Sequence, residues 1–217
     1  MHRRSVAVAL TLVALVAAEA ASQNPPPPPG GAPPAQPGRG GRGGGGGRGG
    51  IQQMTLTATG WTSGGQIPAK HSQAGAELSP MLTWSGAPPN TASFVLVVHD
   101  INAATQNQDR VDDLLHWLVW NIPAAATALP EGVPPGAELP DGTRQISATG
   151  PYYRGPAAAA SGPVHHYVFE LFALDTLINV APVGASPAAT RAAVMAAMVG
   201  HIRGKAAVVG LYRRPPP

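Results

Sequence analysis

Residues 25–50, PPPPPGGAPPAQPGRGGRGGGGGRGG, restrict where this chain can build a folded core. The stretch holds no aromatic and no branched aliphatic side chain, so it offers little to bury. Proline runs favour the polyproline II conformation, and glycine runs behave as flexible coil. We therefore predict a disordered linker over residues 21–50. A single folded domain is expected at residues 51–213, followed by a short Pro-rich tail at 214–217.

The first 20 residues have the features of a secretory signal peptide. Arg3 and Arg4 precede an apolar run over residues 6–18 that is too short to span a bilayer comfortably, and Ala18-Glu19-Ala20 supplies a small-x-small cleavage site. The pattern predicts cleavage after Ala20 and a periplasmic or secreted protein, with an uncleaved anchor helix as the alternative. The chain has no Cys, so the exported domain must rest on a packed core rather than on disulfides.

The basic character of the chain is confined to its N-terminal part. The formal net charge is +3, but five of the 14 Lys and Arg residues and one of the 11 acidic residues precede residue 51, which leaves −1 in the remainder. A near-neutral domain does not favour a general polyanion partner, so nucleic acid is not expected. The linker arginines Arg39, Arg42 and Arg48 could make a peripheral contact with an anionic membrane, although a solvated spacer is the simpler interpretation.

Short apolar runs separated by Gly, Pro, Asn and Asp predict a mainly β fold. Expected strands cover residues 54–61, 93–100, 116–123, 165–175 and 205–212. Several short strands with long irregular connections favour a β-sandwich or a related β fold.

One helix is expected near the C-terminus. Ser186 is a good N-cap residue, Pro187 suits the first helical position, and Gly204 is expected to end the helix. The apolar positions predict which stripe packs on the sheets. That stripe consists of Ala192, Met195, Ala196, Val199 and Ile202. A shorter helix is expected near residues 109–115.

Four polar side chains, Asp100, His116, His165 and Tyr167, stand at or near the ends of expected strands. Side chains alternate between the two faces of a strand. His165 therefore shares a face with Tyr167, whereas His166 points to the other side. His166 is interpreted as a structural or surface residue.

The other histidines and most of the tryptophans are interpreted as structural rather than ligand-binding residues. His99 faces away from Asp100 and is expected to be a packing residue, while His71 and His201 are expected at the surface. The tryptophans at 84, 117 and 120 lie in apolar strands and are expected in the core.

Several segments carry motifs in an order that resembles the phosphatidylethanolamine-binding protein family, including its bacterial Raf kinase inhibitor-like branch. They are Ser79-Pro80-Met81-Leu82-Thr83-Trp84, Asp100-Ile101-Asn102-Ala103-Ala104, His116 to Pro123, Gly155-Pro156 with His165-His166-Tyr167, and Ala173-Leu174-Asp175 with the ending Ala188 to Tyr212. The resemblance covers nearly all of residues 52–213. It implies a sandwich of two antiparallel β-sheets with a C-terminal helix.

The resemblance also implies a small anion-binding pocket at one end of the sandwich. Its expected ligand-binding residues are Asp100, His116, Gly155, Pro156, His165 and Tyr167. The chain departs from the family pattern at Asn102, where a second acid is usual, and at Ala157, where a Pro often follows Gly-Pro.

These residue types suit a phosphate ester or a phospholipid headgroup. Imidazole and phenol groups can donate to phosphate oxygens, and the backbone near Gly155 can approach closely because no side chain blocks it. Asp100 can hold a histidine in its donor tautomer or raise its pKa. Binding is expected to tighten as the pH falls toward about 6.

Other functions remain open at this point. The sequence lacks G-x-S-x-G and the Walker-type phosphate loop, so no enzyme and no cofactor are expected. Asp100, His116 and His165 could instead form a two-His, one-carboxylate metal site. A protease-inhibitory or other protein-interaction module is a third hypothesis, with the Pro/Gly-rich loop Leu129–Arg144 as its recognition surface.

Overall fold

The computed structural model describes residues 50–103, 113–182 and 186–216. The predictions for the signal peptide at 1–20 and for the linker, apart from Gly50, lie outside these ranges. The elements, in chain order, are β1 (Gln52–Gln53), β2 (Thr55–Ala58), β3 (Gly65–Gln66), the 3-10 helix η1 (Ala69–His71), β4 (Leu82–Ser85), β5 (Ser93–Asp100), β6 (Leu114–Pro123), β7 (Ala128–Leu129), β8 (Arg144–Ile146), β9 (His165–Leu174), α1 (Pro187–Met198) and β10 (Ile202–Tyr212).

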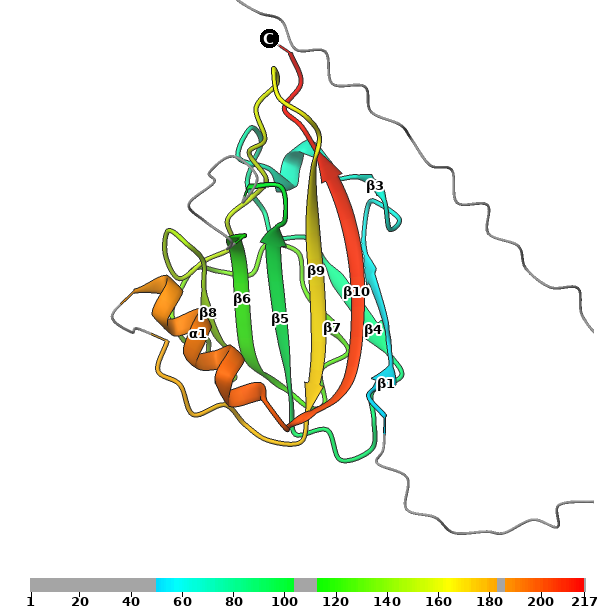
Figure 1. The fold of residues 1–217 in the computed structure, drawn as a ribbon, viewed down its shortest axis with the longest axis vertical. Coiled ribbons are helices and arrows are strands. Elements are labelled where there is room, and N and C mark those ends of the chain that lie inside the picture. The colour runs from blue at the N-terminus through cyan, green and yellow to red at the C-terminus, as the bar shows by residue number, and fades with distance from the viewer. Residues whose placement is uncertain (1–49, 104–112, 183–185, 217) are drawn as a thin grey trace, which may run out of the picture. The chain divides into compact units, whose positions relative to one another are not determined.

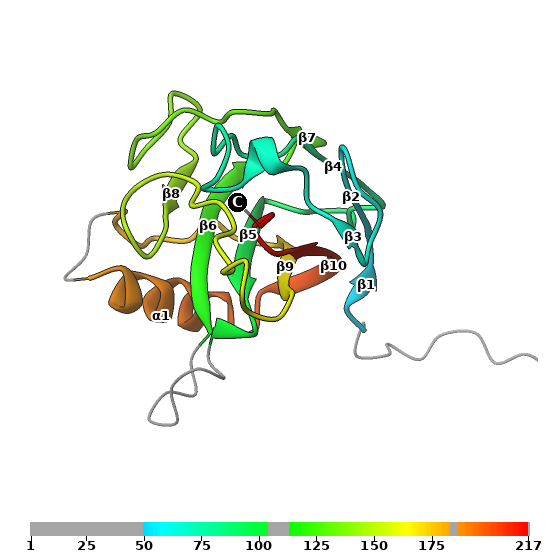
Figure 2. The same cartoon turned by 90° about the horizontal axis from the view of Figure 1, so that it is seen from above.

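The strands form two sheets, which confirms the predicted sandwich. The large sheet has the order β1-β10-β9-β5-β6-β8, with β3 also paired to β10, and the small sheet has the order β2-β4-β7 (Figure 1). Pairing is antiparallel except where β1 and β3 run parallel to β10. Seen from above, α1 and the small sheet lie on opposite sides of the large sheet (Figure 2).

The main core lies between the two sheets. Phe94, Leu96 and Val98 alternate along β5 and face this core, where they meet Leu82 and Trp84 of the small sheet. Trp84 packs edge-on against Phe94, with ring centroids 5.4 Å apart. A run with apolar residues on both faces, such as β5, is what a central strand covered on both sides requires.

A second core lies on the outer face of the large sheet, beneath α1. Val194 and Met198 of the helix are buried there against Val95 and Phe172. The predicted stripe was wrong: Met195 is on the exposed side, and Val199 is 76% exposed. The helix packs instead through Thr190, Val194 and Met198, which follow one another at four-residue spacing. No helix in the described part of the chain is long and apolar enough to cross a membrane.

The ends of α1 follow partly from the sequence. The Ser186 hydroxyl accepts a hydrogen bond from Ala189 N at 3.1 Å, and Pro187 opens the helix, as predicted. The helix ends at Met198 rather than at Gly204, and Gly200 follows it with a φ of +84° that favours glycine. Residues 114 and 115 belong to β6. The rest of the short helix expected at 109–115 lies outside the described residues, except for Asp113.

Candidate functional site

The register of the large sheet brings three strand ends together. Asp100 is the last residue of β5, and its partners are Leu114 at the start of β6 and Tyr167 near the start of β9. Because β5 runs antiparallel to both neighbours, the end of β5 lies beside the starts of β6 and β9. Polar residues far apart in the sequence therefore meet at one end of the sandwich.

A β-bulge turns His116 toward the same side. Val98 pairs with Trp117, but the next residue, His99, pairs with Leu115, so His116 is the extra residue of β6. Regular alternation would place His116 on the face opposite Trp117. The bulge lets both residues face the inner side of the sheet, since a bulge re-aims the side chain that it adds.

Asp100 and His165 form a buried pair. Asp100 Oδ2 accepts a hydrogen bond from His165 Nδ1 at 2.7 Å, and the two residues are 3% and 5% exposed. The other carboxylate oxygen accepts the backbone N–H groups of Asn102 and Ala103, at 2.9 and 3.2 Å. The turn after β5 therefore fixes the carboxylate, and the carboxylate fixes the ring of His165 with hydrogen on Nδ1.

Tyr167 lies between the two histidines. Its ring packs edge-on against His116, at 5.0 Å between centroids, and stacks on His165 at 6.4 Å. Burial, and then the nearby Asp100 carboxylate, raise the pKa of Tyr167 above its usual value. The phenol consequently keeps its hydrogen. Its oxygen also accepts the Ala157 N–H at 3.3 Å.

His116 is bound to the loop before Gly155 by two hydrogen bonds. His116 Nδ1 donates to the Arg154 carbonyl at 2.8 Å, and Arg154 N donates to the His116 carbonyl at 3.0 Å. Nε2 of His116 is buried and has no hydrogen-bond partner among the described residues. Burial lowers the pKa of His116, and the hydrogen bond to Arg154 O opposes this effect. The ring therefore favours the neutral form.

Arg154 was missed by the sequence analysis. It lines the same cavity as the four predicted side chains, and its Nε is buried without a hydrogen-bond partner among the described residues. The sequence signal was a single basic residue immediately before the Gly155-Pro156 motif. That signal is weak, because one arginine in a loop usually lies at the surface.

The cavity has a volume of about 250 Å³ and is bounded by strand ends and by loops. Asp100, His116, His165 and Tyr167 all line it, together with Arg154. The alanine run that follows Pro156, at residues 157–159, forms part of its wall. The structure therefore brings together the four polar side chains of the predicted set.

Gly155 and Pro156 were predicted to bind the ligand, but they are not among the residues that line this cavity. Gly155 N donates to Glu77 Oε1 at 3.0 Å, so this N–H is not directed at the cavity. A Cβ at Gly155 would lie 2.6 Å from the His71 carbonyl oxygen. Glycine is required here for close packing of two loops.

His71, expected at the surface, is fully buried. Its Nδ1 bonds to the Leu78 carbonyl at 2.9 Å, and its ring lies against Trp61. The Tyr153 hydroxyl donates to the His71 carbonyl at 3.0 Å. His71 thus helps to hold the η1 loop against the segment that carries Arg154.

The residues beside the cluster support the predicted alternation. His166 is exposed on the other side of β9. Its backbone N and its Nδ1 both bond to Asn102 Oδ1, at 2.7 and 2.9 Å. Asn102, which stands where the family usually has an acid, therefore ties the β5 turn to the start of β9.

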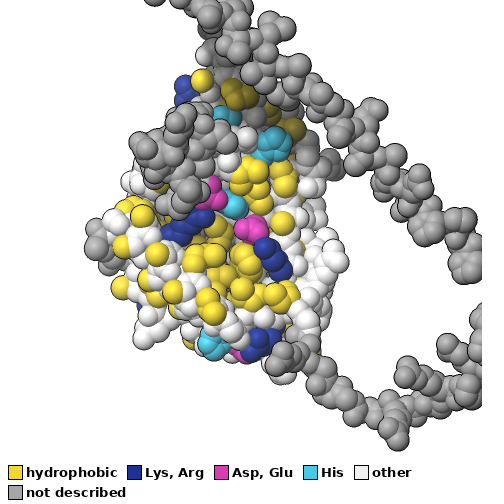
Figure 3. All heavy atoms as spheres, in the orientation of Figure 1, with side chains coloured by type: hydrophobic (Ala, Val, Ile, Leu, Met, Phe, Trp, Pro, Cys, Tyr) yellow, Lys and Arg dark blue, Asp and Glu magenta, His cyan; other side chains and the backbone are white. Residues whose placement is uncertain are grey.

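His99 is not the simple packing residue that was expected. It belongs to a set of charges on the outer face of the large sheet, which we call the outer charge row. The row consists of Arg191, Asp113, His99, Glu170 and Lys205. Acidic, basic and histidine side chains alternate across this face above α1 (Figure 3). Asp113 binds His99 Nδ1, and Glu170 Oε2 lies 3.2 Å from His99 Nε2.

Asp100, His116 and His165, the residues of the alternative metal set, lie close together but do not form a metal site. Within the three described ranges, no group of three or more His, Asp or Glu side chains is arranged to hold a metal ion. Both histidines of the proposed set use Nδ1 in hydrogen bonds, to Asp100 in one case and to a backbone carbonyl in the other.

Comparisons with known proteins agree with the fold and with the order of the motifs. The sequence model described as phosphatidylethanolamine-binding protein matches residues 57–213. A UPF0098 protein of Methanothermobacter thermautotrophicus is 36% identical over 163 residues, which cover 74% of this chain and 99% of that protein. A UPF0098 protein of Pyrococcus horikoshii is 34% identical, with 68% of this chain and 71% of that protein covered.

Two solved structures share the fold. A phosphatidylethanolamine-binding protein homologue of Chlamydia trachomatis has 27% identity and a TM-score of 0.61, over 75% of this chain and 99% of that one. Escherichia coli YbcL, described as a new member of the mammalian PEBP family, has 26% identity and a TM-score of 0.58, over 74% and 98%. From the family match and these relatives together, the chain belongs to the phosphatidylethanolamine-binding protein family.

Proposed function

We propose that this chain is an exported binding protein for small anions that carry a phosphate group, such as a phosphate ester or a phospholipid headgroup. The single observation that carries the proposal is the cavity in which Asp100, His116, His165 and Tyr167 meet beside Arg154. Export is proposed from the N-terminal sequence alone. Binding rather than catalysis is proposed from the sequence, which has neither G-x-S-x-G nor the Walker-type phosphate loop.

Arg154 supplies the positive charge that a phosphate requires. A guanidinium carries several donors in a fixed plane and stays charged at all working pH values. Its Nε is buried and finds no hydrogen-bond partner in the described part of the chain, and a buried donor that lacks an acceptor is costly unless a ligand satisfies it. A phosphate oxygen in the cavity would fill that role.

His116 couples binding to a proton. In the neutral ring the hydrogen sits on Nδ1, which donates to Arg154 O, so Nε2 is left as an acceptor. Nε2 can accept from the P–OH group of a monoanionic phosphate, or it can take up a proton and donate to a dianion. Burial lowers the pKa of the free His116 ring, so the ring is neutral before phosphate binds. By either route the complex then holds one more proton than neutral His116 and dianionic phosphate hold apart. Affinity should therefore rise as the pH falls.

A titration of the isotope-labelled chain tests the proposal. Inorganic phosphate and phosphoethanolamine should shift the NMR signals of the cavity residues in a saturable manner, and acetate should do so more weakly. Absence of saturable shifts with tens of millimolar phosphate would exclude this function. The variant Arg154→Met should weaken phosphate binding by roughly 10-fold or more.

The matched control is Arg203→Met. Arg203 is exposed near the start of β10, at the end of the strand away from the cavity, and pairs with Asp175. Its loss should change phosphate affinity by less than about 2-fold. Equal losses in the two variants would indicate a nonspecific charge effect rather than a built site. Both substitutions change only the side chain and leave the backbone N–H and C=O groups in place.

Calorimetry tests the coupled proton. Phosphate binding near pH 7.5 should take up close to one proton, seen as a dependence of the measured heat on the ionisation enthalpy of the buffer. Uptake should fall markedly in His116→Gln. Heats that do not vary with the buffer would rule out the role given to His116.

A further inference from the structure

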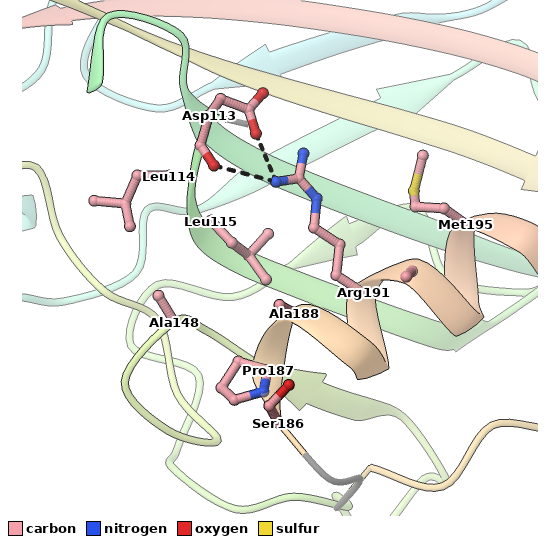
Figure 4. A pocket seen from close by; sticks show the side chains of 10 residues that line it. Asp113, Leu114, Leu115, Ala148, Ser186, Pro187, Ala188, Arg191 and Met195 are labelled. Atoms are coloured by element: carbon pink, nitrogen blue, oxygen red, sulfur yellow. Dashed lines mark hydrogen bonds and ion pairs between the residues drawn. The ribbon is translucent and has the colours of Figure 1, made fainter. Parts of the chain in front are cut away.

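A second and larger hollow lies on the outer side of the large sheet, beside the first turns of α1. Its volume is about 700 Å³, which is within the range of small-molecule sites. Arg191 and Met195 belong to α1 and Leu114 and Leu115 to the start of β6, with Pro187 near the N-terminal end of the helix (Figure 4). We call this hollow the α1 groove. Most of its described lining is apolar.

The charges in the α1 groove compensate each other. Arg191 Nη1 lies 2.5 Å from Asp113 Oδ1 and also donates to the Asp113 carbonyl (Figure 4). Asp113 in turn binds His99. The Arg191 stem presents methylene groups while its head is held by the carboxylate. The groove thus suits an apolar guest better than a second anion.

Leu114 lines both the α1 groove and the anion cavity. It pairs with Asp100 and so faces the cavity side, whereas Leu115 pairs with His99 and faces the α1 side. The first residues of β6 therefore have the cavity on one face and the groove on the other. The two hollows are neighbours across a single strand end.

We propose that the α1 groove receives the aliphatic chain of a phosphate ester whose phosphate occupies the anion cavity, with the chain passing over Leu114. This inference rests on the proposed function and narrows its ligand class to single-chain amphiphiles. The phosphate supplies orientation through Arg154 and His116. The chain supplies affinity by leaving water among Leu115, Met195 and their apolar neighbours.

A chain-length series tests the inference separately from the proposed function. The probes are inorganic phosphate and methyl, butyl, hexyl and octyl phosphate, each below its micelle concentration. Affinity should rise ~3- to 4-fold for each methylene that enters the groove, after the first few that span Leu114. Phosphate binding with no gain along the series would overturn the inference and leave the proposed function standing. No binding of any probe would overturn both.

Two adjacent alanines of α1 provide a matched pair of variants. Both are exposed, but Ala192 lines the groove and Ala193 does not. Ala192→Glu places a carboxylate in the path of the chain, so octyl phosphate should bind roughly 10-fold more weakly than to the wild type, with inorganic phosphate unchanged. Ala193→Glu should change neither. Equal behaviour of the two variants toward octyl phosphate would place the chain elsewhere and contradict the inference.

Discussion

Two histidine–carboxylate clusters lie on opposite faces of the same strand end and differ in the groups that face their buried nitrogen atoms. Asp100 and His99 are consecutive in β5, so one faces the anion cavity and the other faces the outer charge row. In the outer charge row both ring nitrogens of His99 face carboxylates: Nδ1 is hydrogen-bonded to Asp113, and Nε2 lies 3.2 Å from Glu170 Oε2 as an ion pair without hydrogen-bond geometry. In the anion cavity, Nε2 of His116 and Nε of Arg154 are buried without a partner among the described residues.

This difference distinguishes a cluster that stabilises the fold from one that can bind. In the outer charge row each charged group already faces a group of opposite charge, so the row has little net charge to offer an anion. Buried polar atoms without a partner cost free energy of folding, and where they line a cavity a ligand can supply the missing partner. Residue type alone does not separate the two cases, since both contain His and Asp.

The largest expected effect comes from breaking the outer charge row. Glu170 Oε1 accepts from Lys205 Nζ at 2.7 Å, and its other oxygen contacts His99. Glu170→Gln keeps the shape but leaves the charge of His99 with one carboxylate fewer. We expect the free energy of unfolding to fall by about 3 kcal/mol, and Tm by roughly 6–12 °C. Denaturant and thermal unfolding measure both.

The same variant should leave phosphate binding within about 2-fold of the wild type, because the two clusters lie on opposite faces of the sheet. Glu138→Gln, which removes the exposed partner of Arg144, serves as the control and should leave Tm nearly unchanged. A loss of phosphate affinity in Glu170→Gln as large as its loss of stability would show that the two faces are not independent.

The outer charge row should also make the stability of the fold depend on pH. Burial opposes a charge on His99, but the hydrogen bonds and negative charges of Asp113 and Glu170 outweigh burial and raise the pKa of His99 to about 9. A raised pKa stabilises the fold fully below the unfolded value of about 6.5, and that contribution is lost as the pH rises through about 9. Stability should fall by about 3 kcal/mol across this window.

Urea unfolding between about pH 6.5 and pH 9.5 measures this loss. The chain has no Cys, so no thiol titrates in the same range and obscures the effect. His99→Leu should flatten the profile, and a profile in His99→Leu as steep as that of the wild type would assign the loss to another group.

Breaking the anion cavity should affect binding more than folding. In His165→Ala, the Asp100 carboxylate loses the ring that faces it at 2.7 Å, and its charge then repels an anion. Phosphate affinity should fall by about 30-fold. Adding Asp100→Asn to this variant should restore part of the affinity, because the repelling charge is removed. A double variant no better than His165→Ala would contradict the electrostatic explanation.

The strands and their faces could be predicted because they depend on local pattern. Alternation along β5 and β9 correctly separated Asp100 from His99 and His165 from His166. The motif order correctly indicated the family. The face of α1 could not be predicted, since PAATRAAVMAAM is rich in Ala on every side and small residues leave the apolar stripe poorly defined.

Three features of the site depend on tertiary contacts that the sequence does not display. The bulge that turns His116 inward arises from the register between β5 and β6, and no residue type in HWLVWNIP requires it. The role of Gly155 depends on the His71 carbonyl, which belongs to a distant loop. Arg154 was missed for the same reason, because its burial follows from how that loop packs.

The smallest expected effect comes from His166, the neighbour of His165 in the sequence. His166 is exposed, and its ring contacts Asn102 Oδ1 rather than the cavity. Its backbone N–H keeps the bond to the same oxygen in a His166→Ala variant. Phosphate affinity should therefore change by less than about 2-fold, and stability by no more than about 0.5 kcal/mol. Calorimetry on His165→Ala and His166→Ala side by side measures the contrast. Since the two imidazoles differ only in the face of β9 that they occupy, similar losses would mean that alternation does not decide which of them serves the anion.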